Sequence, residues 1–214
     1  MESLDLARTR KMLMRVADVV IDNQDLLTEV DGKIGDADHG IGMAGGMRMV
    51  KQALEDAAGP ASANELFRIV GRTMLMNMGG ASGVIFGSMF QGGCKTAPVS
   101  QRLDAPTLRA LMRGGLESVK DRGKAQVGDK TMVDALEPAV IALECGGEKL
   151  VPLLEAATEA AWSGMEETKK YPARFGRAKA LMERSIGHQD AGATSVWLIF
   201  TAMRDYIRSE AEND

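Results

Sequence analysis

Apolar residues recur at helical spacing along almost the whole chain, in about eight segments separated by short connectors rich in glycine, aspartate or proline. Leu13, Val16 and Val20, for example, follow the i, i+3, i+7 spacing that places side chains on one face of an α-helix. Alternation with a period of two, which is typical of a half-buried strand, does not persist in any segment. The sequence therefore predicts an all-α fold, an up-and-down bundle of about eight antiparallel helices.

Helix boundaries are marked by residues with known terminal preferences. Ser62 and Glu65 have the spacing of a capping box, Pro106 and Pro152 suit the first turn of a helix, and Pro138 predicts a kink. The expected helices run from Leu13 through Leu27, over about 41–58, from Ser62 through Met74, after Gly83 to about Gln91, from Pro106 to before Arg122, from Thr131 to Gly146, from Pro152 through Met165, and from about Gly192 through Ile207.

Length and composition narrow the class of protein. The 214 residues suit a single domain, 1–214, and 15 methionines with 4% aromatic residues indicate an aliphatic core. A net charge of -4 argues against a nucleic-acid partner. We expect no membrane span, because no apolar run approaches about 20 residues, and no signal peptide. Cys94 and Cys145 lack metal-type spacing, so we interpret them as free thiols of a cytoplasmic protein.

The acidic connector near residue 36 is the strongest candidate for a site. Asp31, Asp36 and Asp38 lie within eight residues of one another and are followed by His39 and Gly40. Carboxylates converging from a loop suit a hard cation such as Mg²⁺, which keeps positions open for phosphate. A turn in which the carboxylates cap their own backbone is the alternative interpretation. The pattern argues against the calcium loop of an EF-hand, because the acidic ligands and the closing Glu are missing after Asp38.

Three further connectors carry glycine and polar residues, and an up-and-down topology would gather all four at one rim. They are 79–83, 123–131 and the long connector with Arg177 and His188–Ser195. Helix N-termini built from small residues expose N–H groups that bind phosphate. The rim therefore predicts a nucleotide polyphosphate site, although a flexible turn remains the alternative for 79–83. The chain has no P-loop sequence.

Four motifs in these connectors closely resemble the nucleotide-binding L subunit of dihydroxyacetone kinase. They are Gly35-Asp-Ala-Asp-His-Gly40, Gly79-Gly-Ala-Ser-Gly83, Gly128-Asp-Lys-Thr-Met132, and Arg184-Ser-Ile-Gly-His-Gln-Asp190 with Gly192-Ala-Thr-Ser195. The resemblance covers nearly the whole chain. It implies an eight-helix antiparallel barrel that binds ADP or ATP at one rim through two Mg²⁺ ions.

The resemblance also implies roles for individual residues. The metal ligands would be Asp31, Asp36 and Asp38, and Arg177 would be both a nucleotide contact and the catalytic residue that stabilises the transferred phosphoryl group. The remaining nucleotide contacts would be His39, Gly40, Ala81, Ser82, Gly123, Met132, Asp190 and Gly192. Three positions depart from the family pattern, where Asn and two prolines are usual: Gly42, Val84 and Ala191.

The same resemblance implies a partner, because the family holds its ketose covalently on a separate K subunit or domain. We therefore expect a phosphotransfer subunit of a kinase for dihydroxyacetone or a related small ketose, active only with a K-type subunit. A phosphotransferase-system protein that rephosphorylates bound ADP is a further possible partner. The alternative is a non-catalytic module, loaded with ADP, that binds a transcription regulator or senses nucleotide. A structural Ca²⁺ loop fits less well, because it would leave the other glycine-rich connectors unexplained.

Overall fold

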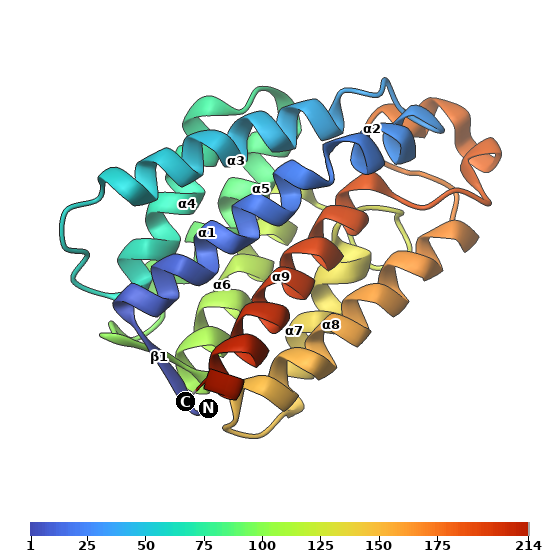
Figure 1. The fold of residues 1–214 in the computed structure, drawn as a ribbon. Coiled ribbons are helices and arrows are strands. Elements are labelled where there is room, and N and C mark those ends of the chain that lie inside the picture. Colours follow the sequence, from blue (N-terminus) through green and yellow to red (C-terminus); the bar gives the residue numbers. More distant parts are fainter. Residues whose placement is uncertain (214) are drawn as a thin grey trace.

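Helices account for most of the computed structural model, which describes residues 1–213 (Figure 1). The elements are β1 (Ser3–Asp5), α1 (Leu6–Asp22), α2 (Gln24–Gly32), α3 (His39–Asp56), α4 (Ala63–Asn77), α5 (Gly80–Gln91), the 3₁₀ helix η1 (Gly92–Lys95), β2 (Arg102–Asp104), α6 (Ala105–Gly123), α7 (Val133–Cys145), α8 (Leu150–Glu167), the 3₁₀ helices η2 (Thr168–Lys170) and η3 (Arg177–Ser185), and α9 (Ala191–Asn213). The prediction of an all-α fold is confirmed.

The long helices form a ring in which each packs against the next. Contacts join α1 to α3, then follow the chain from α3 through α9, and α9 returns to α1, so that the first and last helices lie side by side (Figure 1). Their inward faces are lined by aliphatic and methionine side chains such as Met12, Met47, Leu111 and Leu136, which are fully buried. A closed ring of this kind buries one stripe of each helix and leaves its two ends open to connectors.

Several helix ends follow the sequence signals. The Ser62 hydroxyl accepts the N–H of Glu65 at 3.1 Å, and the Glu65 carboxylate in turn accepts the N–H of Ala61 at 2.8 Å. Asp104 caps α6 in the same way by accepting the N–H of Thr107, one position after Pro106 in the first turn. The predicted starts of α4 and α6 are therefore confirmed.

Two expectations need correction. The predicted first helix is divided at Asn23 into α1 and α2, so the described residues hold nine α-helices rather than eight. At this break the carbonyl of Val19 accepts both the backbone N–H of Asn23 at 3.2 Å and its side-chain amide at 2.7 Å. The structure also contains two strands, β1 and β2, which pair antiparallel through Leu4 and Leu103. Three residues are too few for a visible alternation, which explains why the sequence pattern missed them.

Cys94 and Cys145 are both free thiols. Burial raises the pKa of Cys94 to about 11, which makes this thiol a poor nucleophile.

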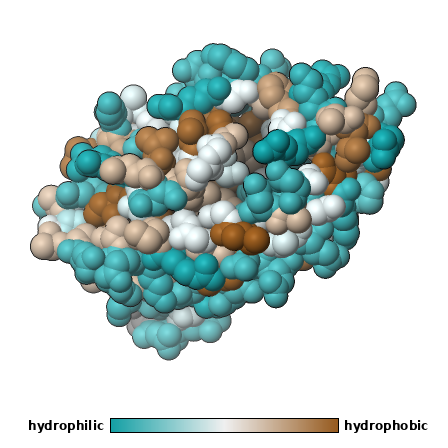
Figure 2. All heavy atoms as spheres, turned by 90° about the horizontal axis from the view of Figure 1, so that it is seen from above, coloured by the Kyte–Doolittle hydropathy of each residue, from teal (hydrophilic) through white to brown (hydrophobic). Residues whose placement is uncertain are grey.

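Within residues 1–213, no helix is at once long enough and apolar enough to cross a membrane. Exposed hydrophobic side chains are scattered among hydrophilic ones on the face that Figure 2 shows, rather than gathered into one patch.

Candidate functional site

Four connectors converge on one cavity of about 920 Å³ at one end of the ring. They are the connectors α2–α3, α4–α5, α6–α7 and α8–α9, which are the four that the up-and-down topology was expected to gather. The lining residues are Asp31, Ile34, Asp36, Asp38, His39, Ile41, Gly42, Met78, Gly79, Gly80, Ala81, Ser82, Ile85, Phe86, Lys130, Thr131, Met132, Phe175, Gly176, Arg177, Ala178, Asp190, Ala191 and Gly192. The volume is that of a pocket for a small-molecule ligand or cofactor.

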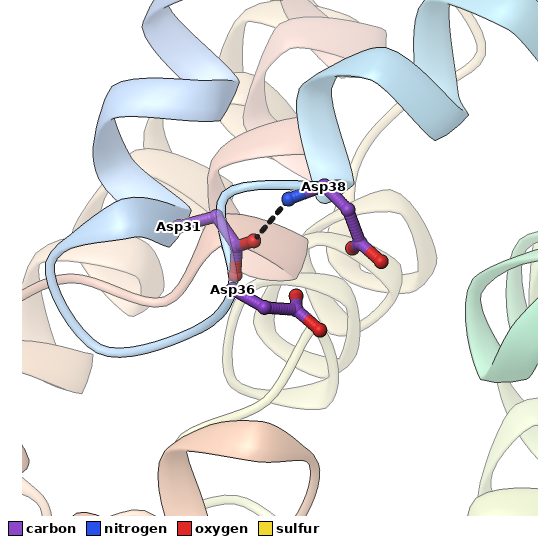
Figure 3. Close-up of side chains that lie close together, drawn as sticks. All are labelled: Asp31, Asp36 and Asp38. Carbon is purple, nitrogen blue, oxygen red and sulfur yellow. Dashed lines mark hydrogen bonds between the residues drawn. The ribbon is translucent and has the colours of Figure 1, made fainter.

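The acidic group lies where α2 ends and α3 begins. Asp31, Asp36 and Asp38 each offer a carboxylate oxygen, and these oxygens lie within 4.8 Å of one another. Asp31 belongs to α2, and its Oδ2 accepts the N–H of Asp38 at 3.1 Å (Figure 3). The same oxygen accepts the N–H of His39 at 3.3 Å. Burial and the neighbouring negative charge of Asp36 raise the pKa of Asp38. Three close carboxylates repel one another, so a divalent cation between them would be favourable.

His39 begins α3 and extends towards α9. Its Nε2 lies 2.8 Å from the Oγ of Ser195, and its ring is 6.0 Å from that of Phe86. Burial lowers the pKa of His39, so the imidazole is predominantly neutral near pH 7. The hydrogen bond with Ser195 fixes the ring orientation at the wall of the cavity.

The N-terminus of α5 faces the same cavity and carries small residues only. Gly79 is the N-cap, no side chain caps the first turn, and Gly80 has a φ of 68°, in the region that favours glycine. Ala81 and Ser82 follow within the first turn. Free N–H groups and the positive end of the helix dipole make this turn suitable for the phosphate groups of a ligand.

The third and fourth connectors meet at Met132 and Gly192. A Cβ on Gly192 would lie 3.3 Å from the Cβ of Met132 and 3.0 Å from Oδ2 of Asp190, so only a residue without a side chain fits easily here. Asp190 accepts the N–H of Ala193 at 2.8 Å at the start of α9, and burial raises its pKa to about 7.

Arg177 contacts the acidic group from another connector. It lies in the long connector between α8 and α9, which Figure 1 shows in orange and red beside α2. Its Nε is 2.9 Å from Oδ2 of Asp36, and its side chain is 78% exposed. The guanidinium group is therefore accessible to a ligand in the cavity that it lines.

Most of the residues predicted for the site line the cavity. Ten of the twelve line the cavity, whereas Gly40 and Gly123 do not. Gly40 is buried against α2, where a Cβ would meet the carbonyl of Gln24 at 2.2 Å, and Gly123 ends α6 beside Ile85. Of the departures from the family pattern, Gly42 and Ala191 line the cavity, and the carbonyl of Val84 accepts the hydroxyl of Ser88 within α5.

Sequence reasoning missed the apolar walls and one charged residue. Ile41, Met78 and Phe175 line the cavity, but from the sequence they resemble ordinary core or loop residues. Lys130 belongs to the motif 128–132, and no separate role was predicted for it, yet it is 2% exposed. Its place in a polar loop gave no sign of this burial, because lysine is rarely buried without partners.

Comparison with known proteins relates this chain to subunits of dihydroxyacetone kinases. The DAK2 domain family matches residues 33–205. The ADP-binding subunit DhaL of the PEP-dependent dihydroxyacetone kinase of Escherichia coli is 41% identical in an alignment 202 residues long, which covers 90% of this chain and 94% of that protein. The ADP-binding subunit DhaL of PEP-dependent dihydroxyacetone kinase 1 of Listeria innocua is 41% identical over 184 residues, or 86% of this chain and 88% of that protein.

A solved structure is similar over nearly the whole chain. The dihydroxyacetone kinase of C. freundii in complex with AMP-PNP and Mg²⁺ matches with a TM-score of 0.72 and 27% sequence identity. The match covers 96% of this chain and 35% of that kinase, so the present chain spans about a third of its length.

Proposed function

This chain belongs to the DAK2 domain family, and we propose that it is the ADP-binding subunit of a PEP-dependent dihydroxyacetone kinase. The observation that carries the proposal is the convergence of three carboxylates and the uncapped N-terminus of α5 on one cavity. A cation site beside a phosphate site is what a bound nucleotide polyphosphate requires. The ring of long helices is then the eight-helix barrel of the family, with α2 as an extension of the first helix.

The donor set fits Mg²⁺, because all three side chains offer hard oxygen atoms and none offers nitrogen or sulfur. Asp31, Asp36 and Asp38 would hold the metal, with two ions expected. When bound, Mg²⁺ neutralises the charge of the polyphosphate. The N–H groups at Ala81 and Ser82 would bind phosphate oxygens.

The remaining residues of the cavity would position the nucleotide. The ring of neutral His39 is oriented by its hydrogen bond with Ser195 and would form a hydrogen bond with a phosphate or ribose oxygen of the nucleotide. Met132 and Gly192 form a close-packed wall suited to a flat or apolar part of the ligand. Gly40 and Gly123 would act indirectly, by allowing the chain segments around the site to approach one another.

Arg177 is the residue we assign to the transfer step. Its planar guanidinium carries several N–H donors, which can hold two oxygens of the phosphoryl group and stabilise the charge that develops on them. Its exposure lets it approach a substrate presented from outside the cavity. Because this chain would supply the nucleotide, the ketose would be held by a separate K-type subunit docked at this rim.

The names of the relatives favour PEP as the ultimate phosphoryl donor, and one relative, from Lactococcus lactis, is named PTS-dependent. A phosphorylated protein of the phosphotransferase system would then reload bound ADP. In that case ADP would remain on the subunit as a resident coenzyme. A free-ATP mechanism would instead require exchange of ADP for ATP in each cycle.

The test is to purify the chain, measure retained ADP, and assay dihydroxyacetone phosphate formation with a K-type subunit of a relative. One arm receives ATP and the other receives PEP with the phosphotransferase proteins of that relative. We expect retained ADP and turnover in the PEP arm. Arg177→Lys should lower kcat at least about tenfold while ADP affinity changes little, because the charge is kept but the planar fork is lost.

Retained ADP without turnover in either arm would overturn the proposed kinase function. It would favour the alternative, a non-catalytic module that binds a regulator. Protein that binds neither ADP nor ATP in the presence of Mg²⁺ would overturn the nucleotide site itself.

A further inference from the structure

Lys130 connects two parts of the chain that are far apart in sequence. Its side chain is 2% exposed, and its Nζ donates to the carbonyl of Thr168 at 2.6 Å and to the carbonyl of His188. Thr168 directly follows α8, and His188 lies shortly before α9. One ammonium group therefore binds both ends of the connector 168–190, which we call the Arg177 segment.

The electrostatic surroundings favour a charged lysine at this point. The carbonyl of Thr168 lies at the C-terminal end of α8, where the helix dipole attracts a positive charge. Burial lowers the pKa of Lys130, whereas the negative charges of Asp190 and Asp134 oppose that shift. A buried ammonium is costly without partners, and here two carbonyls and two nearby carboxylates provide them.

The backbone at Lys130 adopts a conformation that lysine rarely takes. Its φ is 60°, in the left-handed region, which costs free energy for a residue with a side chain. The hydrogen bonds of the buried Nζ offset this cost. The α6–α7 connector is thus shaped so that this side chain enters the space between α8 and the Arg177 segment.

Besides Lys130, two arginines join the middle of the Arg177 segment to the rest of the ring. The N–H of Arg174 donates to the carbonyl of Asp129 at 3.2 Å, and the Nε of Arg177 lies 2.9 Å from Oδ2 of Asp36. Further bonds stay within the segment, such as the N–H of Gly187 to the carbonyl of Lys169 at 2.7 Å and the N–H of Ala173 to the hydroxyl of Ser185 at 2.8 Å. Residues 175–178 from its middle line the cavity.

We propose that Lys130 is a positioning residue that fastens both ends of the Arg177 segment and so holds Arg177 at the cavity. Lys130 acts on the site through this segment, because its Nζ is directed to backbone carbonyls and its stem is buried. The structural part of the proposal is independent of any ligand. Its effect on phosphoryl transfer rests on the proposed kinase function.

Hydrogen–deuterium exchange of the nucleotide-free, full-length protein tests the structural part. Lys130→Met keeps a long apolar stem but removes every donor, so exchange in residues 171–187 should accelerate at least about tenfold, including the amides of Arg174 and Gly187. The helices α4 and α6 should keep their wild-type rates. Exchange of the segment within twofold of wild type would overturn the proposal.

Thr158→Val is the matched control for loss of a buried hydrogen bond. Thr158 is also 2% exposed, and its hydroxyl lies between α8 and α9, where its single proton is shared between the carbonyls of Leu154 at 2.7 Å and Phe200 at 3.2 Å. The Thr158→Val variant should lower the Tm without selectively accelerating hydrogen–deuterium exchange in residues 171–187. Equal acceleration of exchange in this control would overturn the proposal. If Lys130→Met does not fold, Lys130→Gln decides in its place. Failure of both variants to fold would also overturn it, because Lys130 would then be a requirement of the whole fold.

Steady-state kinetics with a K-type subunit test the functional part. In Lys130→Met we expect kcat to fall at least about fivefold, while KM for dihydroxyacetone stays within twofold because the partner holds the ketose. An unchanged kcat alongside faster exchange would overturn the role in transfer. Absence of kinase activity in the wild type would contradict the proposed function instead, and the exchange result would still decide whether Lys130 fastens the segment.

Discussion

The Nε of Arg177 lies 2.9 Å from Oδ2 of Asp36, so the Arg177 segment is joined directly to the acidic group. The two residues come from connectors at opposite ends of the sequence, and different roles were predicted for them. A cation bound at Asp36 and the guanidinium of Arg177 would share one carboxylate. Each should therefore influence the other's position.

Arg177→Ala should strengthen Mg²⁺ binding to the nucleotide-free protein. Removing a positive charge beside Asp36 lowers repulsion of the cation, and an exposed pair of this kind corresponds to about a two- to fivefold change in affinity. Isothermal titration calorimetry measures it. Arg174→Ala, in the same segment but paired with Asp129, is the control and should leave the affinity unchanged. Unchanged or weaker binding in Arg177→Ala would contradict the shared carboxylate.

Asp36→Ala and Asp38→Ala should each weaken Mg·ADP binding by at least about 100-fold, because each removes a hard ligand from the group. Circular dichroism should show unchanged helix content. Asp25→Ala removes an exposed carboxylate from α2 outside the group and should bind like wild type. Wild-type affinity in either test variant would exclude that residue as a ligand.

Asp190→Asn should alter the pH dependence of stability in the nucleotide-free protein. Burial raises the folded pKa of Asp190 to about 7 from 3.8, so the folded state binds the proton more tightly than the unfolded state. The wild type therefore loses stability as pH rises from about 4 to 7, by up to about 1.4 kcal/mol per pH unit. The variant lacks this loss.

Urea unfolding of both proteins at several pH values provides the measurement. The free energy of unfolding of Asp190→Asn relative to wild type should increase between pH 4 and 7 and level off above about pH 7. A relative value that stays constant over this range would contradict the raised pKa of Asp190.

Gly40→Ala should destabilise the protein by about 1–3 kcal/mol. A Cβ at this position would lie 2.2 Å from the carbonyl of Gln24, so α2 and α3 would have to move apart. Gly45→Ala in the same helix is the control, since nothing lies within 4 Å of its Cβ and alanine favours helix by up to about 1 kcal/mol. Thermal or urea unfolding should move in opposite directions in the two variants; a shift of the same sign would contradict the close approach at Gly40.

The sequence by itself determined the helical class, most helix boundaries and the end of the ring at which chemistry is concentrated. These depend on local physics: the 3.6-residue period of apolar side chains, caps such as Ser62, and the glycine-rich starts of helices such as α5. The order of connectors along an up-and-down chain then places Asp31, Ser82 and Asp190 at the same rim, as the cavity confirms.

The tertiary structure alone decided which residues meet across that rim. Packing, rather than sequence spacing, brings Leu4 beside Leu103 and His39 beside Ser195. Packing also decides the break at Asn23 and the burial of Lys130. A motif shows that Lys130 lies in a polar loop. Only the arrangement of α8 and α9 determines that its ammonium reaches two carbonyls, because hydrogen bonds across 38 and 58 residues depend on where the helices pack.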